Sequence, residues 1–350
     1  MELTRKGAKI EELLGFANAL REKGLLRGRS VTEISRNTGF SKKQTSANMK
    51  KLRELKLGAI SASINYRRLP LITAQILVKT THPSQNQQFF TKTLSIPFVE
   101  HVSQVSGGEI THVIAARTPS LEELNKLNAK IREEVNGNYI VDTTTTRVVY
   151  EYAWDEEFSY PAGVVEDKVK MDSTDWRLLG LLKADASTSL TELGEELKLR
   201  APTVLRRIRL LEERGAINGY YSTRTWENIP AELQPISVFL FLRYKYANPA
   251  TEPVVSLITN SKKMWPIEIN FLYGEDDLSA VMRFKSVGSL QKFVDEELGQ
   301  KNILSYVIHP ILRSEATRRV FSDFADYYEA NEKPKAVKAT TMQGRTRLLR

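Results

Sequence analysis

An α+β fold is predicted for this chain of 350 residues, because stretches with helical periodicity alternate with short β-branched stretches along its length. A basic helix between residues 41 and 56 closes a run of short amphipathic helices, and a second such helix closes a similar run at 202–214. Each run is followed by strand and helix patterns in the order βαββαβ. The expected architecture is therefore two winged helix-turn-helix units alternating with two ferredoxin-like βαββαβ domains.

The sequence repeats itself over the helical runs. Residues 31–34 (VTEI) resemble residues 190–193 (LTEL), and residues 58–60 (GAI) recur at 215–217. The offsets are 159 and 157 residues, so the copies differ by a two-residue insertion between these points. A repeat of this kind indicates that the same pair of domains occurs twice in tandem.

Start and stop signals place the helices of the later copy. Ser189 and Glu192 form a capping-box signature before its second helix. Proline suits the first turn of the third helix, 202–214, and Gly215 fits the position just past its end. Residues 216–222 are predicted to form a strand that starts a wing.

The third helix of each copy is amphipathic, with one apolar stripe for its own domain and one basic face. In the earlier copy this helix is capped by Ser41 and carries five lysines and one arginine against one acid. Such a helix can pack on one side and offer donors to DNA on the other. The predicted inner stripes are Met49, Leu52 and Leu55 in the first helix and Val204, Ile208 and Leu211 in the second.

Contacts with double-stranded DNA are expected from the basic faces. Near the helix starts, Gln44 is expected to pair with adenine and Arg200 with guanine, and the later basic residues to hold phosphates. The alternative is that both faces are solvated surfaces without a partner. The predicted DNA-binding residues are Lys42, Lys43, Gln44, Ser46, Lys50, Lys51, Arg53, Arg200, Thr203, Arg206, Arg207 and Arg209.

Each helical unit is followed by a predicted βαββαβ domain. In the first domain, strands are expected at 71–79, 99–106, 110–116 and 142–152, with helices at 83–94 and 121–135. In the second, strands are expected at 236–244, 266–273, 278–284 and 303–312, with helices at 253–261 and 289–298.

The domain boundaries follow from these patterns and from a linker rich in acids around Pro161 and Gly163. The C-terminal segment is basic and low in apolar residues, which predicts a disordered tail. The expected divisions are 1–68 (winged helix-turn-helix), 69–153 (βαββαβ), 154–171 (linker), 172–229 (winged helix-turn-helix), 230–325 (βαββαβ) and 326–350 (tail).

Composition excludes several classes of protein. The absence of cysteine excludes disulfides and thiolate metal sites, and the four histidines lie too far apart in sequence to suggest a metal cluster. No apolar run is long enough for a membrane span and no secretory signal is seen, so a cytoplasmic location without a cofactor is expected. The formal net charge of +9 favours a polyanionic partner.

Residues 202–220 (PTVLRRIRLLEERGAINGY) resemble the recognition helix and wing of the Lrp/AsnC family of transcription regulators. The resemblance implies a winged helix-turn-helix joined to a βαββαβ domain that dimerises and often binds an amino acid. It also implies that Arg206, Arg207 and Arg209 contact DNA. Two tandem copies could pair within one chain as a pseudo-dimer, or two chains could form a homo-oligomer.

An effector site is implied by the same resemblance. The family builds it partly around a Gly-x-x-Asp turn between the second and third strands of the α+β domain, and residues 274–277 (GEDD) match that pattern. The expected effector-binding residues are Gly274, Asp276 and Asp277. The equivalent turn of the first copy, at Gly107 and Gly108, lacks the aspartate. The alternative is that both are ordinary hairpin turns.

A branch of proteins with this architecture resembles siroheme decarboxylases, which use histidine and arginine on a tetrapyrrole carboxylate. His101 and His112 fall on predicted hairpin strands, where they could face a cavity, but the second copy has only His309, on its last strand. No Walker loop, Ser-His-Asp arrangement or glycine-rich dinucleotide motif is seen. We therefore expect a regulator and no enzyme. A third alternative is a protein–protein adaptor, which would show no salt-dependent binding to DNA.

Overall fold

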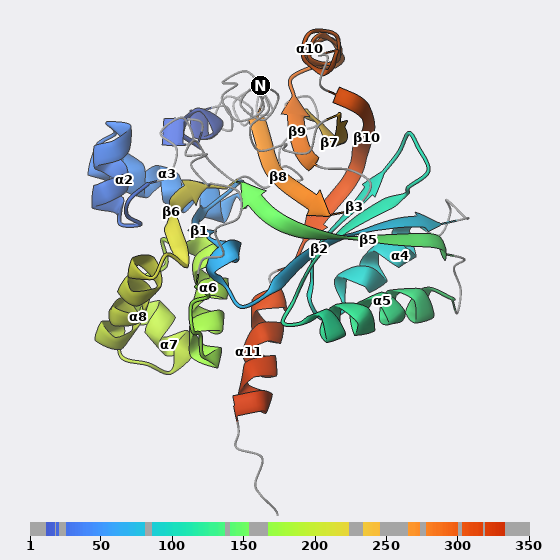
Figure 1. The fold of residues 1–350 in the computed structure, drawn as a ribbon. Coiled ribbons are helices and arrows are strands. Elements are labelled where there is room, and N and C mark those ends of the chain that lie inside the picture. The colour runs from blue at the N-terminus through green and yellow to red at the C-terminus, as the bar shows by residue number, and fades with distance from the viewer. Residues whose placement is uncertain are drawn as a thin grey trace, which may run out of the picture.

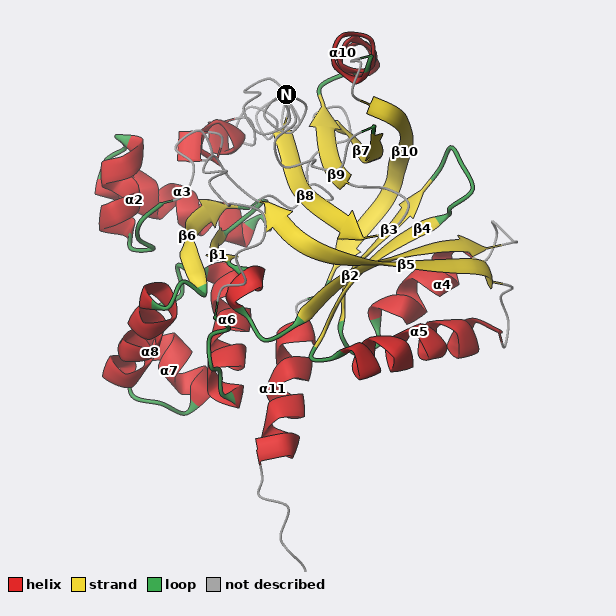
Figure 2. Ribbon diagram, viewed as in Figure 1, coloured by secondary structure: helices red, strands yellow, loops and turns green. Residues whose placement is uncertain are grey.

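A computed structural model of the chain describes residues 12–17, 19–20, 26–80, 86–136, 141–153, 167–223, 234–245, 265–273, 278–299, 303–317 and 319–332. Figure 1 shows two parts. Short helices gather around a two-stranded ribbon on one side of the molecule, and a closed barrel of strands lies beside them. Helices cover the outer faces of the barrel (Figure 2).

The first helical unit contains a helical stretch at 12–17 and 19–20, followed by α2 (Val31–Thr38) and α3 (Lys42–Glu54). Ser30 and Ser41 begin α2 and α3 with full capping boxes, because the side chain at the third helical position returns to the amide of each serine. Gly39, at a φ of 75°, ends α2 in the left-handed conformation that glycine adopts without strain.

The second helical unit contains α6 (Ser173–Asp185), α7 (Leu190–Leu197) and α8 (Ala201–Glu213). Asp172 caps α6, and Ser189 caps α7 as the sequence predicts. Pro202 lies in the first turn of α8, where a missing amide hydrogen costs nothing.

A strand follows the third helix of each unit, and the two strands pair with each other. They are β1 (Ile60–Ile64) and β6 (Ile217–Ser222), and they run antiparallel. The predicted strand at 216–222 is therefore present, but its described strand partner is the other copy and not a second arm of its own wing. Pairing across the copies satisfies backbone groups that a single edge strand would leave open.

The two-residue insertion between the copies lies between the third helix and this strand. Gly215 takes the left-handed position after α8, with a φ of 70°, and Lys56 takes the same position after α3, with a φ of 52°. The Gly58 that matches Gly215 in sequence lies two residues further on, just before β1. The GAI repeat therefore aligns the strand starts and not the helix ends.

The barrel is formed by two four-stranded halves. The first half has β2 (Ile72–Thr80), β3 (Val99–Val105), β4 (His112–Thr118) and β5 (Val141–Ala153), with α4 (Asn86–Leu94) and α5 (Leu121–Asn136) on its outer face. The second half has β7 (Ile236–Tyr244), β8 (Trp265–Tyr273), β9 (Leu278–Phe284) and β10 (Ile303–Ala316), with α10 (Val287–Phe293) and a π-helical turn at Val294–Leu298.

Both halves have the strand order of a ferredoxin-like sheet, and they join at two seams. The continuous order is β10-β3-β4-β2-β5-β8-β9-β7, and β7 closes the barrel on β10. Each seam joins the second strand of one copy to the last strand of the other, at β3–β10 and β5–β8. Both contacts between the two halves are thus made within one chain.

Side chains point alternately to the two faces of each strand, so the core beneath the helices is separate from the core inside the barrel. Ile76 and Val78 of β2 face the helices, whereas Leu77 belongs to a cluster with Phe239 and Phe241 of the other half. The expected strands coincide with the observed ones to within a few residues. The helix predicted at 253–261 lies outside the described residues.

A C-terminal helix, α11 (Arg319–Glu332), leaves the barrel and packs along α6. Phe324 stacks on Trp176 with ring centres 4.3 Å apart. Gly180 allows this approach, because a Cβ there would lie 2.9 Å from the Cβ of Phe321. The boundary expected at residue 326 falls inside this helix, just after its buried residues Phe324 and Ala325, so the helix continues into the segment for which a tail is expected.

Among the helices that the structure describes, none is long and apolar enough to cross a membrane.

Candidate nucleic-acid interface

The basic face of α3 is open to solvent. Thr45, Met49 and Leu52 are buried beneath it, so the inner stripe is shifted by one turn from the predicted one, and Leu55 is 46% exposed. Leu55 leaves the stripe because the helix ends at Glu54. The exposed predicted contacts are Lys42, Lys43, Gln44, Ser46, Lys50, Lys51 and Arg53.

Three of these side chains already have partners. The Gln44 side chain accepts a hydrogen bond from the Ser41 amide at 3.1 Å, which fixes the first turn of α3. Lys50 lies 3.8 Å from Glu54 in an exposed pair of the kind that contributes little to stability. Arg53 lies 3.5 Å from Asp185 of the second unit. Lys42, Lys43, Ser46 and Lys51 complete the outward face.

The packing of α8 matches the prediction. Val204, Ile208 and Leu211 are buried, and Arg206 and Arg209 are exposed. Arg200 is also exposed and stands at the N-cap position without a side-chain cap bond. Thr203, one turn into the helix, is half-buried.

Arg207 differs from its neighbours on α8. Its Nη1 donates to Asp172 Oδ2 at 2.9 Å and to Asp175 Oδ1 at 2.6 Å, at the start of α6. Its side chain is 25% exposed. Both carboxylates also cap the α6 N-terminus, so Arg207 joins α8 to the first helix of the same unit. A phosphate contact from Arg207 would compete with these two ion pairs.

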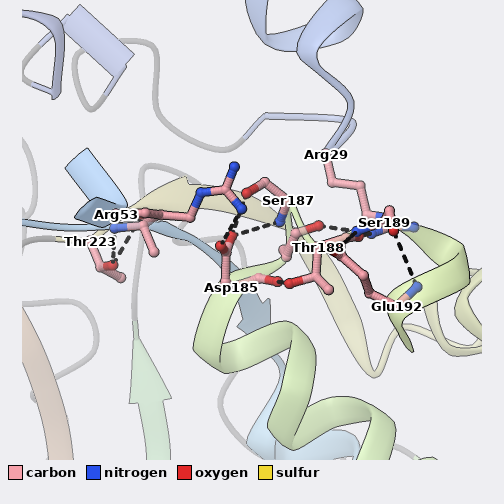
Figure 3. Close-up of polar contacts among 10 residues, drawn as sticks. Arg29, Arg53, Asp185, Ser187, Thr188, Ser189, Glu192 and Thr223 are labelled. Atoms are coloured by element: carbon pink, nitrogen blue, oxygen red, sulfur yellow. Dashed lines mark hydrogen bonds and ion pairs between the residues drawn. The ribbon is translucent and has the colours of Figure 1, made fainter. Parts of the chain in front are cut away.

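The two helical units meet at a polar seam (Figure 3). Arg29, just before α2, donates from Nη1 to the carbonyl oxygens of Ala186 and Thr188, each at 2.8 Å. On the other side of the seam, Thr223 donates its amide to the Ala59 carbonyl at 2.8 Å. These contacts join positions more than 150 residues apart in sequence, and no local pattern announces them.

Asp185 lies at the centre of the seam. It accepts a hydrogen bond from the Ser187 amide at 2.9 Å, and its other oxygen faces Arg53. At the start of α7, the Ser189 amide donates a hydrogen bond to Glu192 Oε2 at 2.9 Å. Hydrogen bonds from the amide and hydroxyl of Ser189 lower the pKa of Glu192 below its ordinary value.

One continuous apolar core lies beneath the seam. It includes Leu20 and Leu52 of the first unit, Trp176 and Ile208 of the second, and Phe324 of α11. Tyr220 of β6 is 1% exposed and pairs by two backbone hydrogen bonds, of 2.7 and 2.9 Å, with Leu26 of the first unit. The two helical units therefore form a single packed body.

A buried ionic cluster joins this body to the barrel. Arg117 of β4 is 4% exposed, and its Nε lies 2.6 Å from Glu100 Oε2 on β3. Its guanidinium stacks 3.4 Å above the ring centre of Tyr66, in the 3-10 turn η1 (Tyr66–Arg68), and Tyr66 donates to Glu100 at 3.0 Å. Burial, and then the Glu100 carboxylate, raise the pKa of Tyr66. The cluster fixes the segment that leaves the first helical unit.

The histidines do not gather at one place. His112 is fully buried against Phe89 of α4, with ring centres 4.6 Å apart. His101 lies three register positions away and its Nε2 is 2.8 Å from Ser314 Oγ on β10. His309 of β10 is buried against the turn between β3 and β4 of the first copy. A Cβ on Gly108 in that turn would lie 2.5 Å from the His309 ring.

The predicted effector turn, Gly274, Asp276 and Asp277, lies outside the described residues. The equivalent turn of the first copy is described, with Gly107 at a φ of 82°. No group of three or more His, Asp or Glu side chains that could hold a metal ion occurs within the described residues.

Comparison with known proteins agrees with the arrangement of the second helical unit. A family profile described as the AsnC-type helix-turn-helix domain matches residues 171–212, which cover α6, α7 and most of α8. The leucine-responsive regulatory protein of Rhizobium meliloti is 32% identical over 133 residues, covering 37% of this chain and 81% of that protein. The chain belongs to the Lrp/AsnC family. Another relative, the HTH-type transcriptional regulator LysM of Sulfurisphaera tokodaii, is 27% identical and covers 39% of the chain and 90% of its own length.

These Lrp/AsnC relatives each align with well under half of the chain, whereas a structure with the same overall fold spans nearly all of it. The siroheme decarboxylase NirDL, solved with an iron-uroporphyrin III analogue, covers 91% of this chain and 97% of its own, with a TM-score of 0.61 and 13% identity. At this identity the likeness concerns the fold alone.

Proposed function

We propose that this Lrp/AsnC chain is a sequence-specific DNA-binding transcription regulator in which one polypeptide supplies both DNA-reading units. The observation that carries the proposal is the exposed basic face on the third helix of each unit, with the apolar face of the same helix buried. A helix exposed in this way can enter the major groove of a duplex. The curated relatives are transcription regulators, which supports the same conclusion.

The barrel would bind the small effector to which the regulator responds. Lrp/AsnC proteins form dimers through this domain, and here the two sheets close on each other within one chain. We propose that an amino acid or another small effector binds near Gly274, Asp276 and Asp277 of the second copy. Isothermal titration with the common amino acids, on the native chain and on an Asp276→Asn/Asp277→Asn variant, tests this site. Equal heats for both proteins would contradict it.

The main test compares the native chain with an Arg206→Ala/Arg209→Ala variant on labelled genomic DNA. Each arginine that holds a phosphate releases counterions, so the variant should bind more weakly and its affinity should depend less steeply on salt. Lys292→Ala is the control, because it removes an exposed positive charge on α10, which lies at the opposite end of the molecule from α8 (Figure 1). Unchanged affinity and salt slope in the double variant would contradict DNA binding through α8.

A second candidate is an enzyme of the siroheme decarboxylase type, favoured by the fold that matches over 91% of the chain. The scattered positions of His101, His112 and His309 do not support a shared catalytic site. The two functions are separated by incubating the purified chain with siroheme and removing unbound ligand. A retained tetrapyrrole absorbance and a product lighter by carbon dioxide would favour the enzyme.

A further inference from the structure

The two helical units cannot be placed independently of each other. They share one core, one antiparallel strand pair and the seam formed by Arg29, Arg53 and Asp185. Figure 1 shows α2 and α3 on one side of the β1–β6 ribbon and α7 and α8 on the other. The positions of α3 and α8 are therefore fixed by contacts inside one chain.

The strand pair also sets the relative direction of the two helices. When Ile60 is taken as equivalent to Ile217, the pairs Ala62–Tyr220 and Ser63–Gly219 exchange with each other. A pseudo-twofold axis therefore passes between these pairs. Two third helices related by such an axis meet a duplex in opposite orientations, as the helices of a homodimer do on an inverted repeat.

The surfaces that the two helices offer are not equivalent. Both helices have 13 residues, so positions can be compared by counting from the N-caps, Ser41 and Arg200. Gln44 stands where α8 has Thr203, and Ala47 stands where α8 has Arg206. Lys50 stands where α8 has Arg209. Lysine presents a single ammonium, whereas arginine has a planar fork that binds guanine through two hydrogen bonds. The two helices therefore suit different bases.

We infer that one chain reads one non-palindromic DNA site, built from two unlike half-sites in inverted orientation and at one fixed spacing. The inference rests on the proposed function, and it adds the class of DNA that the function requires. A homodimer repeats the same contacts in both half-sites and so selects a palindrome. Here the covalent pairing of two different helices removes that requirement.

Selection from a random duplex library with the full-length chain tests the inference. The expected product is a two-part consensus whose halves differ and always occur in one order. A palindromic consensus, or a single half-site, would overturn the inference while leaving DNA binding intact. Failure to enrich any sequence above a no-protein control would overturn the proposed function as well.

A swap variant assigns each half-site to its helix. Arg200→Ser, Thr203→Gln, Arg206→Ala and Arg209→Lys together give α8 the residues that α3 has at the same four positions. The new Ser–Gln pair also introduces a capping box like that of α3, so the helix should remain folded. Because Lys42, Lys43 and Ser46 of α3 are not transferred, selection with this variant should shift the α8 half-site toward the α3 half-site. An unchanged consensus in the α8 half would overturn the assignment.

The reciprocal variant, Ser41→Arg/Gln44→Thr/Ala47→Arg/Lys50→Arg, is the matched control and should shift the α3 half-site toward the α8 half-site instead. Spacing is tested on the selected site by inserting five or ten base pairs between the halves. Either insertion should lower affinity to that of a single half-site. Recovery at ten base pairs, which restores the helical phase, would show that the units move apart and would overturn the fixed spacing.

Discussion

The helices α3 and α8 are alike inside and different outside. Each has 13 residues and buries its fourth, eighth and eleventh positions, so the two fit their domains in the same way. Their first turns differ, because α3 begins with a Ser41–Gln44 capping box and α8 begins at Arg200 with Pro202 behind it. Packing on the rest of each unit requires apolar or small side chains at the same inner positions, whereas the outer faces carry different residues.

The two units also differ in what supports them. In the second unit, α6 is covered by α11 and joined to α8 by Arg207. The first unit depends on the seam instead, since Arg53 reaches Asp185 at the end of α6 and Arg29 reaches the loop that follows it. The second unit is thus the support on which the first is positioned, and perturbing each in turn measures the difference.

The largest effect is expected from Phe324→Ala. This side chain is 1% exposed and stacks on Trp176, so its removal leaves a cavity between α11 and α6. The free energy of unfolding should fall by about 3–5 kcal/mol, measured by denaturant titration. Leu55→Ala in the first unit, at a side chain that is 46% exposed, is the control and should change stability by less than about 0.5 kcal/mol. Equal effects would mean that α11 does not support α6.

Gly108→Ala should have the next largest effect, because it tests the contact between the two copies in the barrel. The new methyl group would lie 2.5 Å from the His309 ring, and a loss of stability of about 1–3 kcal/mol is expected. Adding His309→Ala should recover part of the loss.

The control for Gly108 is Gly288→Ala in α10, where the nearest atom would be 3.8 Å away. This change should be neutral or stabilising, as alanine is a better helix former than glycine. If the Gly108 and Gly288 variants behaved alike, the contact between the turn and His309 would not contribute to the barrel.

Local signals in the sequence were sufficient for most of the elements. Ser189 and Glu192 predicted the start of α7, and the inner stripe of α8 was predicted residue by residue. These features depend on neighbours three or four positions away, which the chain itself displays. The apolar pattern places Leu55 in the inner stripe although it lies outside α3, because a helix end can shift without changing the pattern.

Contacts between the copies could not be predicted in the same way. Arg29 reaches carbonyl groups 157 and 159 residues away, and β1 finds its partner in β6. Every residue type has a backbone carbonyl, so the sequence does not show which carbonyl accepts a hydrogen bond. The composition of a short strand likewise does not specify which strand it pairs with. The ion pairs of Arg207 could not be predicted for a related reason, because its acidic partners lie at the start of another helix.

Arg207→Gln and Arg206→Gln should separate support from DNA contact within α8. Loss of the two ion pairs of Arg207 should lower the free energy of unfolding by about 1–2 kcal/mol while leaving the salt dependence of DNA binding unchanged. Arg206 is exposed, so its replacement should reduce the salt slope by about one unit and hardly alter stability. A reduced slope in the Arg207 variant would show that this side chain leaves its carboxylates for a phosphate.

The smallest effect concerns the pH dependence of the helix starts. The pKa of Glu192 is lowered by its hydrogen bonds to Ser189, so its carboxylate stabilises the fold above the ordinary value of 4.5, and that stability is lost as the pH falls below it. Glu192→Gln keeps the capping geometry but does not titrate. Its Tm should therefore lie slightly below that of the native chain at neutral pH, and the difference should shrink at lower pH. At the start of α3 the Ser41 amide donates the equivalent hydrogen bond to the side-chain oxygen of Gln44, which does not titrate. The start of α3 should therefore show no such pH dependence. A pH-independent difference in Tm would mean that the charge of Glu192 does not stabilise the start of α7.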